Sequence, residues 1–218
     1  MEEGKFITFE GGEGVGKSTQ LARLAKALSA HGIDVLPTRE PGGSAGAEQI
    51  RDLLVTGVVE RWTPISELLL LFAARADHVE KTIKPALSCG TWVLCDRFSD
   101  STLAYQGYGH GVRLEVISQL HDLVVGKFQP DFTLYLDINV DDGLRRANNR
   151  KRLSSHELVG EEDRFERMNL PFHEKIRNGF KKIVDENSDR CILIDASKDE
   201  NCVFDAIFQA VKGRFSLA

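Results

Sequence analysis

A glycine-rich segment near the start of the chain, GGEGVGKS, has the residue types and spacing to bind phosphate. It matches the pattern G-x-x-x-x-G-K-[ST] from Gly11 to Ser18. Glycines let backbone N–H groups converge on an anion, and a following helix adds its positive N-terminal end. We expect Lys17 to reach the β- and γ-phosphates and the Ser18 hydroxyl to bind Mg²⁺. The predicted ATP-binding residues are Gly11, Gly12, Glu13, Gly14, Val15, Gly16, Lys17, Ser18 and Thr19.

A second set of chemically useful residues ends the apolar run TWVLC, where Asp96 is followed by Arg97. A carboxylate at a strand tip beside a phosphate loop can hold Mg²⁺ directly or through water, which makes Asp96 a second metal candidate beside Ser18. An adjacent arginine can bind a phosphate group through two parallel hydrogen bonds. These two residues alone leave open a simpler alternative, a solvated ion pair at a strand end.

The elements that must position these residues alternate between strand and helix. Apolar strand candidates cover 5–10, 34–38, 91–95, 132–137 and 191–194. Helical stretches cover 18–31, 47–55, 65–88, 114–125, 141–152, 164–186 and 202–215. Alternation of this kind, with strands that are continuous apolar runs, predicts an α/β fold with a five-stranded parallel sheet flanked by helices. The phosphate-binding pattern then lies between a strand and a helix, which disfavours a mere connecting turn.

The composition bounds the function. A chain of 218 residues with 42% hydrophobic and 28% charged residues fits one globular domain, 1–218. The net charge of −5 argues against a nucleic-acid partner, and the longest apolar run, 68–74, is too short to cross a membrane. The four cysteines lack metal spacing and the start MEEGK lacks a leader, so we expect a cytoplasmic protein with reduced thiols. The six histidines also lack metal spacing; His78 and His173 are interpreted as helix residues near the rim of the site.

Other users of a phosphate loop fit less well. A switch GTPase should carry D-x-x-G and N-K-x-D motifs, and neither occurs in this sequence. A large mechanical ATPase needs a longer chain. A small-molecule kinase remains, and a nucleotide-gated binding protein without phosphoryl transfer is the alternative from a different class.

The segment Asp96-Arg97-x-x-x-Ser101-x-x-Ala104-Tyr105-Gln106 resembles the thymidylate kinase family. Three further segments agree with this family: TREPGG at 38–43, LLLLFAARADH at 68–78 and DRFE at 163–166. The matched segments run from residue 6 to about residue 173. The resemblance implies a P-loop NTPase fold, Mg²⁺-dependent transfer of the γ-phosphoryl group of ATP to dTMP, and a homodimer. The nearest alternative is a kinase for another nucleoside monophosphate.

The resemblance also implies roles for individual residues. Arg51 and Arg97 match arginines that bind the dTMP phosphate, and Arg75 matches the arginine that binds the thymine edge. Tyr105 matches an aromatic residue beneath the sugar, where a 2′-hydroxyl would be crowded. Glu13 matches a loop carboxylate near the acceptor's sugar and phosphate. The implied substrate-binding residues are Glu40, Arg51, Leu71, Phe72, Arg75, Arg97, Ser101, Tyr105 and Gln106.

One position departs from the family pattern on the base side. Members usually have a phenylalanine four residues before the base-binding arginine, stacked on thymine. Here that position is Leu71, and Phe72 follows. Two alternatives stay open: Leu71 supplies an apolar face without stacking, or a local shift brings Phe72 to the base.

A second departure concerns the positive charge needed for phosphoryl transfer. Some members carry an arginine in the phosphate loop at the place that is Gly14 here. The helix 141–152 offers Arg146 and Arg150 on one face, which resembles the bacterial members with catalytic arginines in a lid, at about 148–164. A solvated basic face is the alternative. The predicted catalytic residues are Lys17, Arg97, Arg146, Arg150 and Glu13.

Three further expectations concern the flanks of the site. Asp163 is expected to cap the helix that follows the lid. Asp137, at the end of the strand 132–137, is expected to have a structural or lid-contact role. The loop 195–200 is expected to pass beside adenine through backbone contacts.

Overall fold

The computed structural model describes residues 3–153 and 164–217, with the backbone alone for 150–153. Its centre is a five-stranded, fully parallel sheet with the order β2-β3-β1-β4-β5. The strands are β1 (Phe6–Glu10), β2 (Val35–Arg39), β3 (Trp92–Asp96), β4 (Phe132–Asp137) and β5 (Cys191–Asp195). The sequence prediction of a five-stranded α/β fold is confirmed, and each strand lies within a residue of its predicted bounds.

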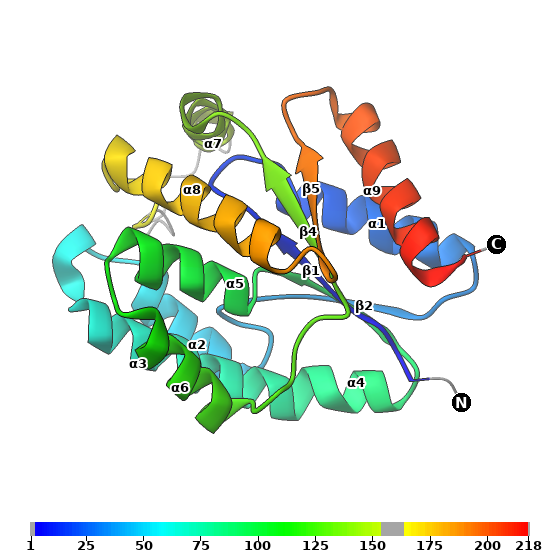
Figure 1. Ribbon diagram of the computed structural model, residues 1–218, viewed down its shortest axis with the longest axis horizontal. Coiled ribbons are helices and arrows are strands. Elements are labelled where there is room, and N and C mark those ends of the chain that lie inside the picture. The colour runs from blue at the N-terminus through cyan, green and yellow to red at the C-terminus, as the bar shows by residue number, and fades with distance from the viewer. Residues whose placement is uncertain (1–2, 154–163, 218) are drawn as a thin grey trace.

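Helices cover both faces of the sheet (Figure 1). On one face, α1 (Lys17–Ala30) and α9 (Glu200–Phe215) pack on alternate strand residues that include Ile7 and Phe9. On the other face, Phe6 packs against α4 (Lys84–Ser88), and Tyr135 packs against α8 (Leu170–Glu186). The helices α2 (Ala45–Val55), α3 (Pro64–His78) and α6 (Leu114–Val124) form a group beyond this second layer.

The helical stretch predicted at 65–88 is interrupted. The chain runs as α3, then a π-helical segment at Val79–Ile83, then α4. Pro85, the second residue of α4, cannot donate a backbone hydrogen bond to the preceding turn. The wider π turn accommodates this missing bond without ending the helical path.

Two more differences affect the site. No element was predicted between 97 and 113, where the structure has α5 (Ser99–Thr102) and a π-helical segment at Leu103–Gly109. The helix predicted at 164–186 begins only at Leu170, because the Asn169 side chain accepts a 3.0 Å hydrogen bond from the Phe172 N–H and so caps α8. The preceding Arg164 is instead buried against α3, where its Nη1 lies 2.5 Å from the Glu67 carboxylate.

The sheet order places the candidate site. The carboxyl ends of β1, β3 and β4 lie side by side, so the phosphate loop, Asp96 and Asp137 share one edge of the sheet. Ligands of open parallel sheets bind at this edge, where neighbouring connections leave in opposite directions. Among the described residues, no helix is long and apolar enough to cross a membrane.

Candidate active site

The glycine-rich loop joins β1 to α1 in a shape that only glycine adopts cheaply. Gly14 and Gly16 have φ angles of +68° and +94°, in the left-handed region. Gly16 precedes α1 without a side-chain cap, so the first N–H groups of the helix remain available to an anion. The buried Lys17 donates from Nζ to the carbonyl oxygens of Gly11 (3.2 Å) and Gly12 (2.8 Å). The lysine is therefore held at the mouth of the loop, as a phosphate ligand requires.

The two predicted metal ligands come together beside this loop. The Ser18 hydroxyl donates a 2.8 Å hydrogen bond to Oδ2 of Asp96. Two exposed oxygen ligands at a phosphate site suit Mg²⁺, which usually keeps several waters and takes its remaining ligands from the substrate. Within residues 3–153 and 164–217, no group of three or more His, Cys, Asp or Glu side chains is placed to hold a metal by itself.

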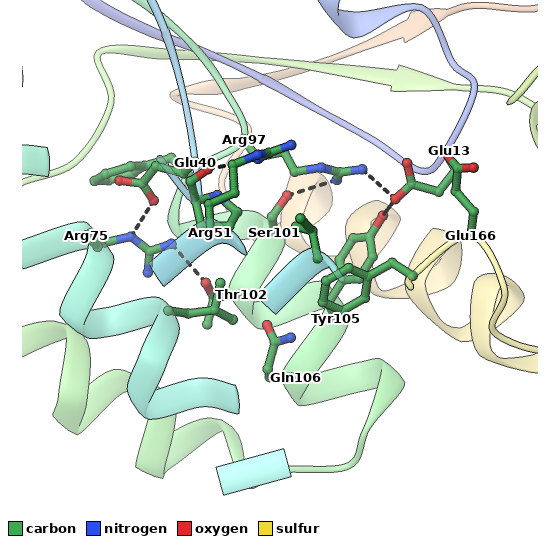
Figure 2. A pocket seen from close by; sticks show the side chains of 15 residues that line it. Glu13, Glu40, Arg51, Arg75, Arg97, Ser101, Thr102, Tyr105, Gln106 and Glu166 are labelled. Atoms are coloured by element: carbon green, nitrogen blue, oxygen red, sulfur yellow. Dashed lines mark hydrogen bonds and ion pairs between the residues drawn. The ribbon is translucent and has the colours of Figure 1, made fainter. Parts of the chain in front are cut away.

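A cavity lies on the other side of the loop, beneath α2 and α3 (Figure 2). It is lined by the predicted Glu13, Glu40, Arg51, Leu71, Arg75, Arg97, Ser101, Tyr105 and Gln106. Phe72 is the exception: it is buried against Leu68 and Ile117 and does not line the cavity. The turn of α3 that directs Leu71 to the cavity directs Phe72 to the core, and this favours the first alternative, in which Leu71 supplies the apolar face.

Arg97 connects the loop with this cavity. Its Nη1 donates to the Gly11 carbonyl oxygen (2.8 Å) and to the Ser101 Oγ (3.2 Å), and its Nη2 donates to Glu13 Oε1 (2.8 Å). The Tyr105 hydroxyl donates to the same Glu13 oxygen at 2.7 Å, and its ring lies 4.9 Å beneath the guanidinium. The predicted catalytic residue Glu13 thus joins the nucleotide loop to the acceptor side.

The charge of Glu13 follows from these neighbours. Burial alone raises the pKa of this carboxyl, but the positive charges of Arg97 and Lys17 and the hydrogen bond from Tyr105 outweigh it and lower the pKa to about 2. Glu13 is therefore a carboxylate at any neutral pH. For Lys17 burial is the largest influence and lowers its pKa, whereas Asp96 and Glu13 partly oppose that change.

Arg75 has one free donor in the cavity wall. Its Nε donates to Glu40 Oε2 (2.8 Å) and its Nη2 to the Thr102 Oγ1 (2.9 Å). Among the described residues, its buried Nη1 has no protein partner. Because a buried N–H group without a partner is costly, this donor is available to a ligand. The neighbouring Gln106 uses its amide N–H to bind Glu67 Oε1 at 2.8 Å.

Sequence reasoning missed six residues that line the cavity: Pro41, Val55, Phe98, Thr102, Phe165 and Glu166. Thr102 neighbours the predicted Ser101 and could have been included if α5 had been recognised. Phe165 and Glu166 come from the segment that leads into α8, and Arg164 brings them here by binding the Leu54 and Val59 carbonyl oxygens at 3.1 Å each. The segment DRFE at 163–166 was noted as family pattern, but nothing in the sequence connects it with Leu54 and Val59, so the place of Phe165 and Glu166 in the cavity wall was not predicted.

The other side of the phosphate loop is bounded by α7 (Val140–Leu153) and by the loop after β5. Arg146 donates from Nη1 to the Ala196 carbonyl oxygen at 3.0 Å, and it lines a hollow with Gly14, Thr19 and Lys198. The Arg150 side chain, Asp163 and most of the predicted lid 148–164 lie outside the described residues. Asp137 accepts two hydrogen bonds from Arg177 (2.7 and 3.0 Å), which gives it a structural role.

Comparisons with known proteins agree in the family they indicate. A family model described as Thymidylate kinase matches residues 9–207. A thymidylate kinase of Caulobacter vibrioides is 49% identical over 217 residues and 100% of both chains, and one of Magnetococcus marinus is 47% identical over 213 residues and 98% of both. A crystal structure of thymidylate kinase from Ehrlichia chaffeensis aligns with a TM-score of 0.74 and 36% identity, covering 96% of this chain and 99% of that one.

Proposed function

Since this chain belongs to the thymidylate kinase family, it transfers the γ-phosphoryl group of ATP to dTMP, and we propose which residues serve each part of that reaction. The products are dTDP and ADP, in the synthesis of dTTP for DNA replication. The observation that carries the assignment of residues is the shared carboxylate of Glu13. It lies in the phosphate loop and binds both Arg97 and Tyr105 in the cavity wall.

ATP is placed along the loop Gly11–Thr19. The backbone N–H groups at the start of α1 and the Lys17 ammonium bind its phosphates. Mg²⁺, when bound, neutralises charge on the phosphates, and Ser18 and Asp96 are the residues that would hold it. The adenine end lies toward the hollow formed by Thr19, Arg146 and Lys198.

The acceptor dTMP is placed in the cavity of Figure 2. Arg97 and Arg51 bind its phosphate, and Tyr105 packs beneath its sugar. The free Nη1 of Arg75 binds a carbonyl oxygen of thymine, and Leu71 supplies an apolar face to the base. The chemistry needs no strong base, because the attacking phosphate is already an anion; it needs alignment and positive charge.

Additional positive charge is assigned to α7 and the segment that follows it. Arg146 and Arg150 remain our candidates, within one kinase domain whose lid spans about 148–164. The geometry of Arg146 supports a place beside ATP, since its guanidinium is held on the Ala196 carbonyl oxygen. Arg146 then holds the nucleotide, and Arg150 stabilises the negative charge on the γ-phosphoryl group during its transfer.

We propose a homodimer in the cytoplasm. Apolar side chains are exposed on α3 and on α2 and α6, which both pack against it, namely Leu53, Ile65, Leu69, Leu114 and Leu123. Burying such a group against a second copy would remove it from water. All four cysteines are free thiols, as in a reducing compartment. Sedimentation of Leu69→Asp, with the exposed Leu193→Asp on β5 as control, tests the dimer: only the α3 variant should become monomeric.

The function is tested by measuring ADP release with ATP, Mg²⁺ and one monophosphate at a time: dTMP, dUMP, UMP, CMP, dCMP, dGMP and AMP. We expect strong preference for dTMP, with weaker use of dUMP. A flat profile, or preference for another base, would overturn the acceptor assignments of Arg75, Ser101 and Gln106. Absence of any diphosphate product would favour a nucleotide-binding protein instead.

A further inference from the structure

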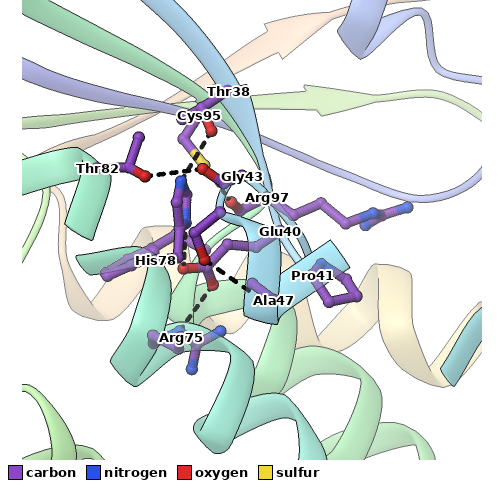
Figure 3. Close-up of polar contacts among 12 residues, drawn as sticks. Thr38, Glu40, Pro41, Gly43, Ala47, Arg75, His78, Thr82, Cys95 and Arg97 are labelled. Carbon is purple, nitrogen blue, oxygen red and sulfur yellow. Dashed lines mark hydrogen bonds and ion pairs between the residues drawn. The ribbon is translucent and has the colours of Figure 1, made fainter. Parts of the chain in front are cut away.

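Behind the cavity wall, four side chains form a continuous line of polar contacts that ends on Arg75 (Figure 3). The Thr38 Oγ1 lies 2.8 Å from Nε2 of His78, and His78 Nδ1 lies 3.1 Å from Oε1 of Glu40. The other oxygen of Glu40 accepts the 2.8 Å hydrogen bond from Arg75 Nε. The line begins at the end of β2, crosses to α3 and returns to the segment after β2.

Three of the four side chains in the line are buried, and Thr38 is half-buried. Glu40, Arg75 and His78 are 5%, 2% and 0% exposed. Because a carboxylate only accepts hydrogen bonds, the His78 proton lies on Nδ1 and points at Glu40. Gly43 leaves room for this arrangement: a β-carbon there would lie 2.2 Å from His78 Nε2 and 2.4 Å from the Thr38 Oγ1. His78 is therefore a buried residue with specific polar partners, and the expectation that it lies near the rim of the site is corrected.

The contact with His78 decides how Glu40 can bind Arg75. A free carboxylate beside an arginine tends to take two parallel hydrogen bonds from the guanidinium. Here Oε1 of Glu40 is held by His78 and Oε2 accepts from Arg75 Nε, so Arg75 donates a single hydrogen bond to this carboxylate. Its Nη2 is then bound by Thr102, and Nη1 alone is left for a ligand in the cavity.

We propose that His78 is a positioning residue for base selection: by holding Oε1 of Glu40 it fixes the carboxylate that binds Arg75 at Nε, and so keeps the Nη1 of Arg75 directed at the acceptor base. This inference rests on the proposed role of Arg75 in binding dTMP. An N–H donor at this point accepts a base with a carbonyl oxygen there and disfavours one with an amino group. His78, though it touches no substrate, thereby contributes to the preference for dTMP over dCMP.

The test compares His78→Leu with His78→Asn in the full chain. Leucine fills the space without a donor. Glu40 is then free to turn and to accept from both Nε and Nη2 of Arg75, which would displace Thr102 and turn the guanidinium. Asparagine can place its amide N–H near the position of Nδ1 and retain the bond to Glu40. Steady-state kcat and KM are measured for dTMP, dCMP and ATP, with thermal unfolding recorded for each variant.

We expect His78→Leu to lower kcat/KM for dTMP about tenfold or more, the loss that one hydrogen bond to a charged group produces. The value for dCMP should fall much less, so the dTMP:dCMP ratio should drop, while KM for ATP stays within about twofold. His78→Asn should restore most of that ratio. A purely structural role would instead lower the unfolding temperature and affect the kinetics with both acceptors alike.

A milder variant keeps the test decisive if His78→Leu does not fold. Thr38→Val removes only the hydroxyl group that holds Nε2, and we expect a smaller drop of the dTMP:dCMP ratio, about two- to fivefold. If the unmodified protein prefers dTMP and the folded variants keep its dTMP:dCMP ratio, the role of His78 is overturned while the proposed acceptor site stands. If the unmodified protein shows no such preference, the proposed acceptor site fails, and the role of His78 fails with it.

Discussion

The backbones of Gly14, in the phosphate loop, and Gly143, in α7, are packed directly against each other. A β-carbon at Gly14 would lie 1.9 Å from the Gly143 carbonyl oxygen, and one at Gly143 would lie 2.5 Å from the Glu13 carbonyl oxygen. The place where some family members carry a loop arginine is therefore closed here by the helix that carries Arg146. In this chain, an arginine at position 14 would require α7 to move away from the loop.

This contact predicts that Gly143→Ala disturbs nucleotide binding. The added methyl group must push α7 away from the loop, because its neighbour is backbone and cannot rotate aside. We expect a loss of about 1–3 kcal/mol of stability, the usual cost of overpacking, together with a higher KM for ATP. Urea unfolding and steady-state kinetics measure both quantities.

Gly213→Ala is the matched control for that variant. Gly213 lies in α9, and a β-carbon there would meet nothing within 4 Å. Alanine should stabilise this helix by up to about 1 kcal/mol and leave KM for ATP unchanged. If Gly143→Ala left KM for ATP unchanged, as Gly213→Ala should, the packing of α7 on the loop would not influence the nucleotide site.

Arg97→Ala should lower kcat by about 10²- to 10³-fold, because it removes the positive charge that joins Glu13 to the acceptor phosphate. The affinity for ATP should remain nearly intact, since Lys17 and the loop N–H groups are unchanged. Arg23→Ala, which removes an arginine paired with Glu200 at the α1–α9 surface, serves as the control and should retain full turnover. An unchanged kcat in Arg97→Ala would contradict the assignment of Arg97 to the acceptor phosphate.

The buried Glu10 predicts a dependence of stability on pH. Burial and the nearby Asp100 raise the pKa of this carboxyl to about 7, against hydrogen bonds from the Ser101 Oγ (2.5 Å) and the Phe98 N–H (2.7 Å) that lower it. In the unfolded chain a glutamate titrates near 4.5. Between pH 4.5 and 7 the Glu10 carboxyl keeps its proton in the folded protein but has lost it in the unfolded chain. The free energy of unfolding should therefore fall as the pH rises from 4.5 to 7.

The size of this effect is on the order of 3 kcal/mol at most. Glu10→Gln cannot titrate, so the difference in unfolding free energy between the two proteins should change over this window and level off above it. Urea unfolding at several pH values measures that difference. A constant difference from pH 4 to 8 would show that Glu10 has the same pKa in the folded and the unfolded protein.

Magnesium dependence tests Ser18 and Asp96. Removal of Mg²⁺ with a chelator should abolish ADP formation, because the phosphate charges are then not neutralised. Asp96→Asn keeps an oxygen near the Ser18 hydroxyl but removes the charge, and we expect it to raise the Mg²⁺ concentration for half-maximal rate about tenfold. Asp34→Asn, at an exposed position before β2, should leave the requirement unchanged. An equal requirement in both variants would remove Asp96 from the metal site.

The sequence by itself determined the phosphate loop, the parallel sheet and most of the acceptor residues. The loop motif is contiguous, so Gly11–Thr19 could be recognised without knowledge of the fold. The strands were found because residues covered on both faces are continuously apolar. Arg75 and Arg97 lie in short segments of family pattern, each local in the chain, and they line the cavity together with Arg51.

The tertiary structure alone decided which side chains face which partner. Leu71 and Phe72 are neighbours in sequence, and only the packing of α3 against α6 sends one to the cavity and the other to the core. His78 and Arg164 lie in segments that resemble the family, but the sequence did not indicate their partners, Glu40 and Glu67, which lie far away along the chain. Local periodicity indicates where a helix runs, but the direction of each side chain depends on long-range packing that periodicity does not contain.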